Sequence, residues 1–97
     1  KERINMEKSI MSKFNEWLVQ DYQNRLGHVS KSSVGHRIRQ IKWLLIKPAS
    51  EYNYHDRKCL RHSINKFLEF YINTTLNRNE NKEFINMLNK ITNNINK

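Results

Sequence analysis

Apolar residues in the first half of the chain recur every third or fourth position, which is the spacing of one face of a helix. The first such stretch covers about residues 6–26, and Gly27 follows it as a residue type that readily adopts the left-handed conformation at a helix end. A second stretch begins in the serine-rich segment 30–33, where a hydroxyl can cap free backbone N–H groups, and must end before Pro48. The predicted buried stripes of these two helices are Ile10, Phe14, Trp17, Leu18, Tyr22 and Leu26, and then Val34, Ile38, Ile41 and Leu45.

The second half of the chain predicts two further helices. Residues 48–54 form a connection with room for a short helical turn, and about residues 55–74 carry the clearest amphipathic pattern. A polar break at 77–81 precedes a fourth helix over about residues 81–95, whose Asn-rich background is a poor helix former, so we expect its order to depend on docking. The predicted stripes are Leu60, Ile64, Phe67, Leu68 and Tyr71, and then Phe84, Leu88, Ile91 and Ile95.

Composition agrees with an all-α class. Two glycines and one proline leave few residues for the tight turns of β-hairpins. The 97 residues are enough for one compact domain, and a hydrophobic content of 37% predicts a lean core. We therefore expect residues 1–97 to form a single helical domain, with a bundle over about 6–75 and a C-terminal helix at 81–96. Because the chain does not begin with Met, we expect it to be a piece of a longer protein.

The charge is strongly positive and unevenly distributed. The formal net charge is +9, and residues 28–66 contain nine Lys and Arg against Glu51 and Asp56, a local excess of +7. Such an imbalance speaks to binding partners rather than to fold. Nucleic acid is the leading partner that it predicts, ahead of an anionic membrane surface. A solvated basic surface with no special partner is the plain alternative.

Advancing about 100° per residue places the cations on the outer faces of the second and third helices. These faces lack the Glu–Lys pairs of an ordinary solvated helix, with Glu69 as the exception, and Asn, Gln and Arg suit base edges in a major groove. Trp43 and Lys47 also fall on the outer half, where Trp43 is suited either to stacking on nucleic acid or to packing on a neighbouring helix. Predicted phosphate contacts are Lys31, Arg39, Lys42, Arg57, Lys58, Arg61 and Lys66, and predicted contacts nearer the bases are Ser32, His36, Gln40, His62 and Asn65.

Three segments carry a family resemblance: "FNEWL" at 14–18, "SKSSV" at 30–34 and "LRHSINKFLEFYI" at 60–72. Over about residues 10–75 their order resembles the core-binding domain of tyrosine recombinases, the phage-integrase family, although Arg37 stands where that family often has an aromatic. The resemblance implies a small orthogonal bundle of four or five helices, similar to a SAM-like domain. It also implies a prokaryotic, viral or mobile-element origin and a cytoplasmic, nucleoid-associated location.

The same resemblance implies how the domain would work. It would clamp double-stranded DNA at a recombination site while a separate catalytic domain of the same protein performs the chemistry. The second and third helices would approach the major groove. The first and last helices would contact other recombinase protomers on the DNA.

No catalytic site is expected within this chain. "HRIR" at 36–39 and "LRHS" at 60–63 echo boxes of the family's catalytic domain, but both lie in amphipathic helices and no tyrosine follows Tyr71. His55, Cys59 and His62 fall on one helical side, yet no fourth zinc ligand accompanies them, so we expect neither metal nor cofactor. The lone Cys59 excludes an internal disulfide and suits a reducing interior, and no apolar run predicts a membrane span.

Two other functions stay open from the sequence. One is a stand-alone helix-turn-helix regulator, although that motif needs a turn of about 3–4 residues and the predicted link contains Pro48 and is longer. The other is a helical protein-interaction module whose basic surface meets an acidic protein.

Overall fold

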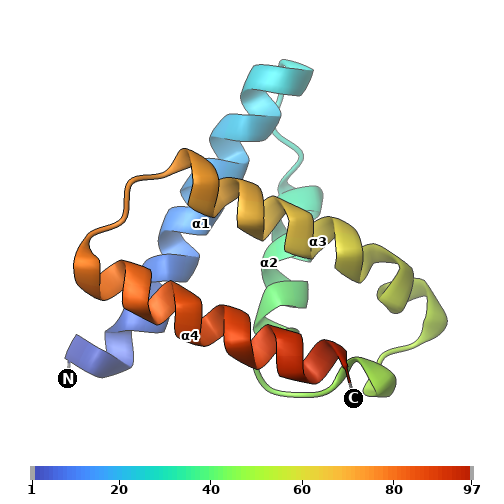
Figure 1. Ribbon diagram of the computed structural model, residues 1–97. Coiled ribbons are helices and arrows are strands. Elements are labelled where there is room, and N and C mark those ends of the chain that lie inside the picture. The colour runs from blue at the N-terminus through green and yellow to red at the C-terminus, as the bar shows by residue number, and fades with distance from the viewer. Residues whose placement is uncertain (1, 97) are drawn as a thin grey trace.

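The computed structural model contains four α-helices and one short 3-10 helix, which confirms the all-α class (Figure 1). It describes the backbone of residues 2–96 and the side chains of residues 10–54 and 57–96. No strand occurs within the described backbone. The elements are α1 (Glu2–Leu26), α2 (Lys31–Leu44), η1 (Ala49–Glu51), α3 (Tyr54–Asn73) and α4 (Arg78–Ile95).

Local signals in the sequence fix where these helices begin and end. Gly27 has a φ of 77° and ends α1, as a residue without a side chain can adopt this conformation without strain. The Ser30 hydroxyl accepts a hydrogen bond from the Ser33 backbone N–H at 3.3 Å and caps α2. At α4, Asn77 and Glu80 form a reciprocal capping box. This cap explains why α4 starts at Arg78, before the predicted helix start at about residue 81.

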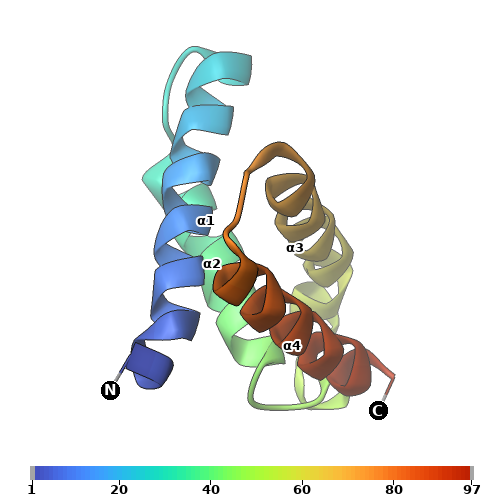
Figure 2. The same ribbon diagram turned by 60° about the vertical axis from the view of Figure 1, so that its left-hand side comes forward.

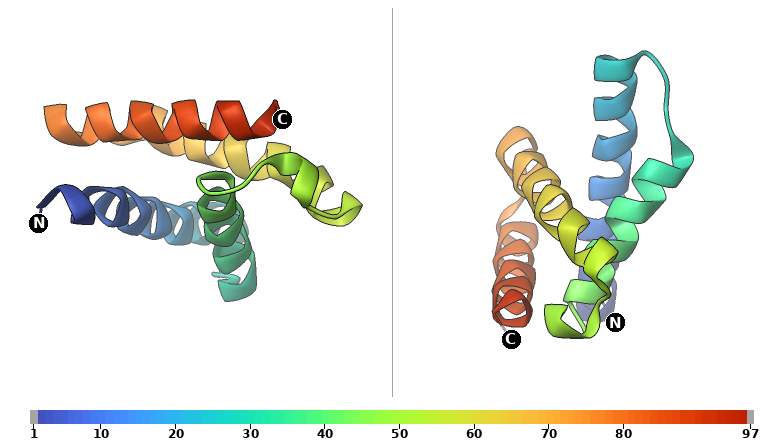
Figure 3. Two further views of the ribbon diagram at one scale, coloured as in Figure 1. Left: turned by 90° about the horizontal axis from the view of Figure 1, so that it is seen from below. Right: turned by 90° about the vertical axis from the view of Figure 1, so that its right-hand side faces the viewer.

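The four α-helices pack around one core. α3 and α4 lie on the same side of the α1–α2 pair (Figure 2), and α1 contacts each of the other three α-helices. Seen from below, α1 and α4 run along opposite sides of the molecule while α2 points toward the viewer (Figure 3).

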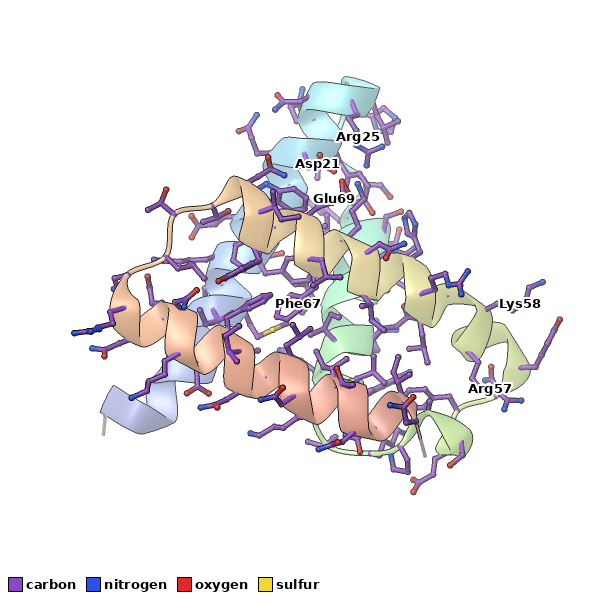
Figure 4. All side chains as sticks on the ribbon, viewed as in Figure 1. Asp21, Arg25, Arg57, Lys58, Phe67 and Glu69 are labelled. Carbon is purple, nitrogen blue, oxygen red and sulfur yellow. The ribbon has the colours of Figure 1, made fainter. Side chains whose placement is uncertain are left out.

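Aromatic rings hold the centre of the core. The side chains of Phe14, Phe67 and Phe84 come from α1, α3 and α4, and each is fully buried. The Phe67 ring centroid lies 5.0 Å from that of Phe14 and 4.6 Å from that of Phe84, within the range of favourable ring contacts. Phe67, drawn at the middle of the bundle in Figure 4, thus joins three helices.

The buried faces of α2 and α3 are rotated from the predicted stripes. On α2, Leu44 is fully buried whereas Leu45 is only partly so; on α3, Ser63 and Phe70 are fully buried whereas Ile64 is partly so. α2 and α3 contact each other through the faces that carry Gln40 and Ser63. Because both side chains are polar, the predicted apolar stripes do not include them. At α1 and α4, the predicted burial of Leu26 and Ile95 is wrong: these side chains are 51% and 38% exposed, because both lie at helix ends beyond the core.

Candidate nucleic-acid interface

The outer face of α3 presents the clearest cluster of unpaired cations. Arg57, Lys58 and Arg61 are exposed, and Arg57 and Lys58 lie at the edge of the molecule near the start of α3 (Figure 4). The Lys58 ammonium lies 5.4 Å from the centroid of the exposed Tyr54 ring. Ion pairs occur at Lys13, Arg25 and Lys66, and Arg57, Lys58 and Arg61 take part in none with a described carboxylate. The three α3 cations therefore have no carboxylate partner among the described side chains.

Arg57 and Arg61 border a hollow that we call the α3–α4 hollow. Its volume is about 440 Å³, and Asn65 lines it beside the two arginines. Its remaining walls are apolar and come from η1, α3 and the end of α4, namely Ala49, Leu60, Ile64 and Ile95. Three predicted contact residues are thus brought together in one place.

Lys31 and Lys42 border a second, larger hollow of about 630 Å³, the α1–α2 hollow. Met11, Ser12, Asn15 and Val19 of α1 form one wall. Val29, Val34, Gly35 and Ile38 form the rest with the two lysines. The two hollows share no residue, so the structure divides the predicted cations between two places.

The other predicted residues of α2 border neither hollow. Ser32 and Arg39 are exposed, and His36 is half-buried. On α3, His62 is also exposed. Although the residue is exposed, partial burial of its imidazole, followed by the positive charges of Arg37 and Lys66, holds the pKa of His62 below its ordinary value.

The predicted outward orientation of Gln40 is wrong, since its side chain is fully buried. Its Oε1 atom accepts a hydrogen bond from the Ser63 hydroxyl of α3. The Arg37 guanidinium donates to the same amide oxygen at 3.4 Å and to the Ser63 hydroxyl at 2.9 Å. A buried amide requires such partners, and here they are polar side chains on its own helix and on α3.

The predicted outward orientation of Lys66 is wrong as well, with a residue exposure of only 6%. Its ammonium lies 3.0 Å from an Asp21 carboxylate oxygen on α1 and 3.3 Å from one of Glu69 on α3. Burial raises the pKa of the Asp21 carboxyl, but hydrogen bonds from Arg25 and Lys66 outweigh this, so its pKa lies below the ordinary value. Lys66 is thus engaged in joining two helices.

Arg37 has a structural position that the sequence did not reveal, and Trp43 has one of the two positions that the sequence left open. Arg37 is half-buried at the α2–α3 contact and also reaches the Cys59 backbone carbonyl at 3.4 Å. Trp43 is half-buried with its ring centroid 5.6 Å from that of Tyr52. Lys47, expected to point outward, lies over both rings at 5.0 and 5.1 Å. Packing, the second of the two roles considered for Trp43, is the one that its surroundings indicate.

The described residues contain no group of three His, Cys, Asp or Glu side chains placed to hold a metal ion. The side chain of His55 lies outside the described residues, so the spacing of His55, Cys59 and His62 is not described. None of the helices, over the part of the chain that is described, has the length and apolar character needed to cross a bilayer.

Comparison with known proteins yields no relative. No protein-family model, no curated protein and no solved structure matches the chain.

Proposed function

We propose that this chain binds double-stranded DNA through the outer face of α3, with help from Arg39 and neighbouring residues of α2. The observation that carries the proposal is the group Arg57, Lys58 and Arg61, exposed on one helix without a carboxylate partner among the described side chains. Protein cations that neutralise phosphates release bound counterions, which is the main source of affinity for DNA. The net charge of +9 adds long-range attraction.

Polar groups on the same exposed side supply the means to contact bases. Asn65 follows Arg61 by one helical turn, and His62 is its neighbour on the exposed arc. An α-helix fits the width of the major groove, where amide and imidazole groups meet base edges. Gln40 and Lys66 are not part of this interface, because both are buried in contacts between helices.

We further propose that the domain serves an integrase-type tyrosine recombinase as its core-binding module, with catalysis in a separate domain. Supporting features are the four-helix all-α architecture, the serine cap that opens α2 and the buried Phe67 and Phe70 of the family-like run in α3. Contacts with other protomers would use the first and last helices. Ile85 and Ile95 of α4, which are 40% and 38% exposed, are apolar groups available for that purpose.

The rival helix-turn-helix reading finds no support at α2 and α3. Residues 45–53 separate these helices and contain η1, whereas that motif joins its helices by a turn of about 3–4 residues.

Duplex affinity measured over a range of salt concentrations tests the DNA proposal. We expect the logarithm of the binding constant to fall linearly with the logarithm of salt concentration. The double variant Arg57→Ala/Arg61→Ala should reduce that slope by about 2, since each lost phosphate contact removes about 0.9. Arg78→Ala/Lys82→Ala is the matched control, because it removes two exposed cations from α4. An unchanged slope in the double variant, or an equal loss in the control, would reject the α3 interface.

A further inference from the structure

The α1–α2 hollow has a regular arrangement of cations around an apolar floor. Lys31 and Lys42 are eleven residues apart on α2, which is close to three full helical turns, so they lie on one line about 16 Å apart along the axis. Gly35 and Ile38 lie between them on the same line and also border the hollow. The surface is therefore an apolar strip with a positive charge at each end.

The described residues of the opposite wall carry no charge to balance the lysines. This wall is formed by α1 through Met11, Ser12, Asn15 and Val19, none of which is charged. Val19 is 37% exposed, whereas Phe14 and Leu18 of the same helix are fully buried. No described residue of α3 or α4 lines the hollow, so it is separate from the α3 part of the proposed DNA face.

Gly35 leaves the floor of the hollow open. A Cβ atom added at this position would meet no heavy atom within 4 Å. Glycine within a helix is unfavourable relative to alanine, and here no close contact with a neighbouring helix requires it. Its effect on the surface is to deepen the hollow midway along the strip between the two lysines.

From this arrangement we propose that the α1–α2 hollow is a docking site for an acidic amphipathic helix of a partner protein. The apolar face of such a helix would fill the strip around Gly35, Ile38 and Val19. Two acidic residues spaced by about three turns would pair with Lys31 and Lys42, in the helix-in-groove mode of peptide recognition. A second copy of this chain is a poor occupant, because each copy carries a net charge of +9.

The hollow suits a helix better than a DNA duplex. Its volume of about 630 Å³ and its apolar residues Met11, Val19, Val34 and Ile38 favour apolar side chains, whereas duplex DNA presents a charged backbone that gains little from an apolar floor. DNA occupation is nevertheless a distinct outcome of the experiment below.

The test selects peptide ligands and then blocks the hollow. A phage-displayed library of random 16-residue peptides is panned against the protein, and enriched peptides are synthesised and titrated by fluorescence anisotropy. The blocking variant is Gly35→Met, which adds a side chain to the hollow without altering charge and without a clash at Cβ. We expect enriched peptides with apolar residues at helical spacing and Asp or Glu near both ends, and at least tenfold weaker binding to Gly35→Met.

Charge variants test the role of the lysines. Lys31→Glu/Lys42→Glu should weaken binding of the acidic peptide at least tenfold, and exchanging the peptide's two acids for lysines should restore it. Arg78→Glu/Lys82→Glu makes the same charge change on exposed positions of α4 and should have little effect. Thermal melting of every variant checks that the fold is retained.

Three results would overturn the proposal. One is the absence of any enriched peptide, and another is equal binding of the enriched peptides to wild type and Gly35→Met. The third is a loss of duplex DNA affinity in Gly35→Met as large as its loss of peptide affinity, which would assign the hollow to DNA. Conversely, failure of the α3 variants to change DNA binding would leave the peptide result untouched, so the two proposals fail separately.

Discussion

The Nζ atom of Lys66 on α3 lies 3.0 Å from the Oδ2 atom of Asp21 on α1, across 45 residues of sequence. The lysine side chain is 7% exposed and the aspartate side chain 18% exposed. Arg25, one turn further along α1, shares the same oxygen at 3.0 Å but is 47% exposed. Figure 4 shows Asp21, Arg25 and Glu69 gathered at this end of the bundle. The Asp21 carboxylate thus forms ion pairs with two cations, the buried Lys66 and the exposed Arg25.

Replacing Asp21 should destabilise the fold more than replacing its exposed partner. Asp21→Asn leaves the buried Lys66 ammonium with Glu69 as its remaining carboxylate. We expect a loss of about 2 kcal/mol in the free energy of unfolding, below the roughly 3–5 kcal/mol typical of a fully buried pair. Arg25→Gln should cost less than about 0.5 kcal/mol, as exposed pairs do. Urea denaturation of both variants measures the difference, and equal losses would contradict the assignment.

Stability should decline in acid because two carboxyl groups have lowered pKa values. Hydrogen bonds from Lys13 and from the Asn77 backbone lower the pKa of Glu80 below its ordinary 4.5, and hydrogen bonds to Asp21 outweigh its burial and bring its pKa below 3.8. The unfolded chain therefore takes up protons first as the pH falls. The stabilisation is complete above these ordinary values and is lost as the pH falls through the lowered ones.

Urea midpoints measured between pH 6 and pH 2.5 report this acid loss. Glu80→Gln should make the urea midpoint depend less on pH below about pH 4.5, because the variant has no carboxyl at position 80 to take up a proton. Glu83→Gln, which changes a neighbouring half-buried carboxyl on the same helix, is the control. A profile that is the same in wild type and Glu80→Gln would show that this carboxyl does not contribute.

The four helices were predictable from the sequence because capping and stop signals act locally. Gly27 and Pro48 mark helix ends by their own backbone restrictions, and the chain obeys both. The predicted start of α4 lies too late, because Asn77 belongs to a polar segment without apolar periodicity, whereas its side chain and that of Glu80 satisfy the first free N–H groups. The presence of each helix could therefore be predicted from residues that lie close together in the sequence.

Which side of each helix faces inward could not be obtained from apolar spacing alone. Gln40 and Ser63 are polar, yet each is fully buried because it satisfies the other across the α2–α3 contact. Lys66 is buried because Asp21, remote in sequence, lies opposite it. Polar residues paired over long sequence distances leave no periodic signal, so the outward orientation predicted for Gln40 and Lys66 is wrong. The outward orientation predicted for Lys58 and Arg61 is confirmed.

Removing the Ser63 hydroxyl should reveal the strength of this buried contact. The hydroxyl accepts from Arg37 at 2.9 Å and donates to Gln40. Ser63→Ala removes both interactions inside the core, and we expect a loss of about 1–3 kcal/mol. Ser32→Ala, at an exposed position of α2, should stay within about 0.5 kcal/mol of wild type. Chemical denaturation compares the two, and a neutral Ser63→Ala would contradict the network's contribution.

DNA binding through α3 should be linked to protonation of His62. In the free protein, burial and then the charges of Arg37 and Lys66 keep the pKa of this imidazole below 6.5. A phosphate bound beside it adds negative charge and raises that pKa, so the complex takes up a proton that the free protein does not hold. Affinity should therefore increase as the pH falls from 7.5 to 5.5 at constant ionic strength.

The His62→Gln variant separates this effect from general electrostatics. Duplex affinity of wild type should tighten several-fold over that pH interval, because a pKa increase of one unit corresponds to about 1.4 kcal/mol, while His62→Gln should show a much flatter profile. His28→Gln, in the exposed segment between α1 and α2, should retain the wild-type profile. If His62→Gln and wild type respond equally to pH, the phosphate does not lie beside His62, and the DNA must contact α3 through its Arg57 end alone.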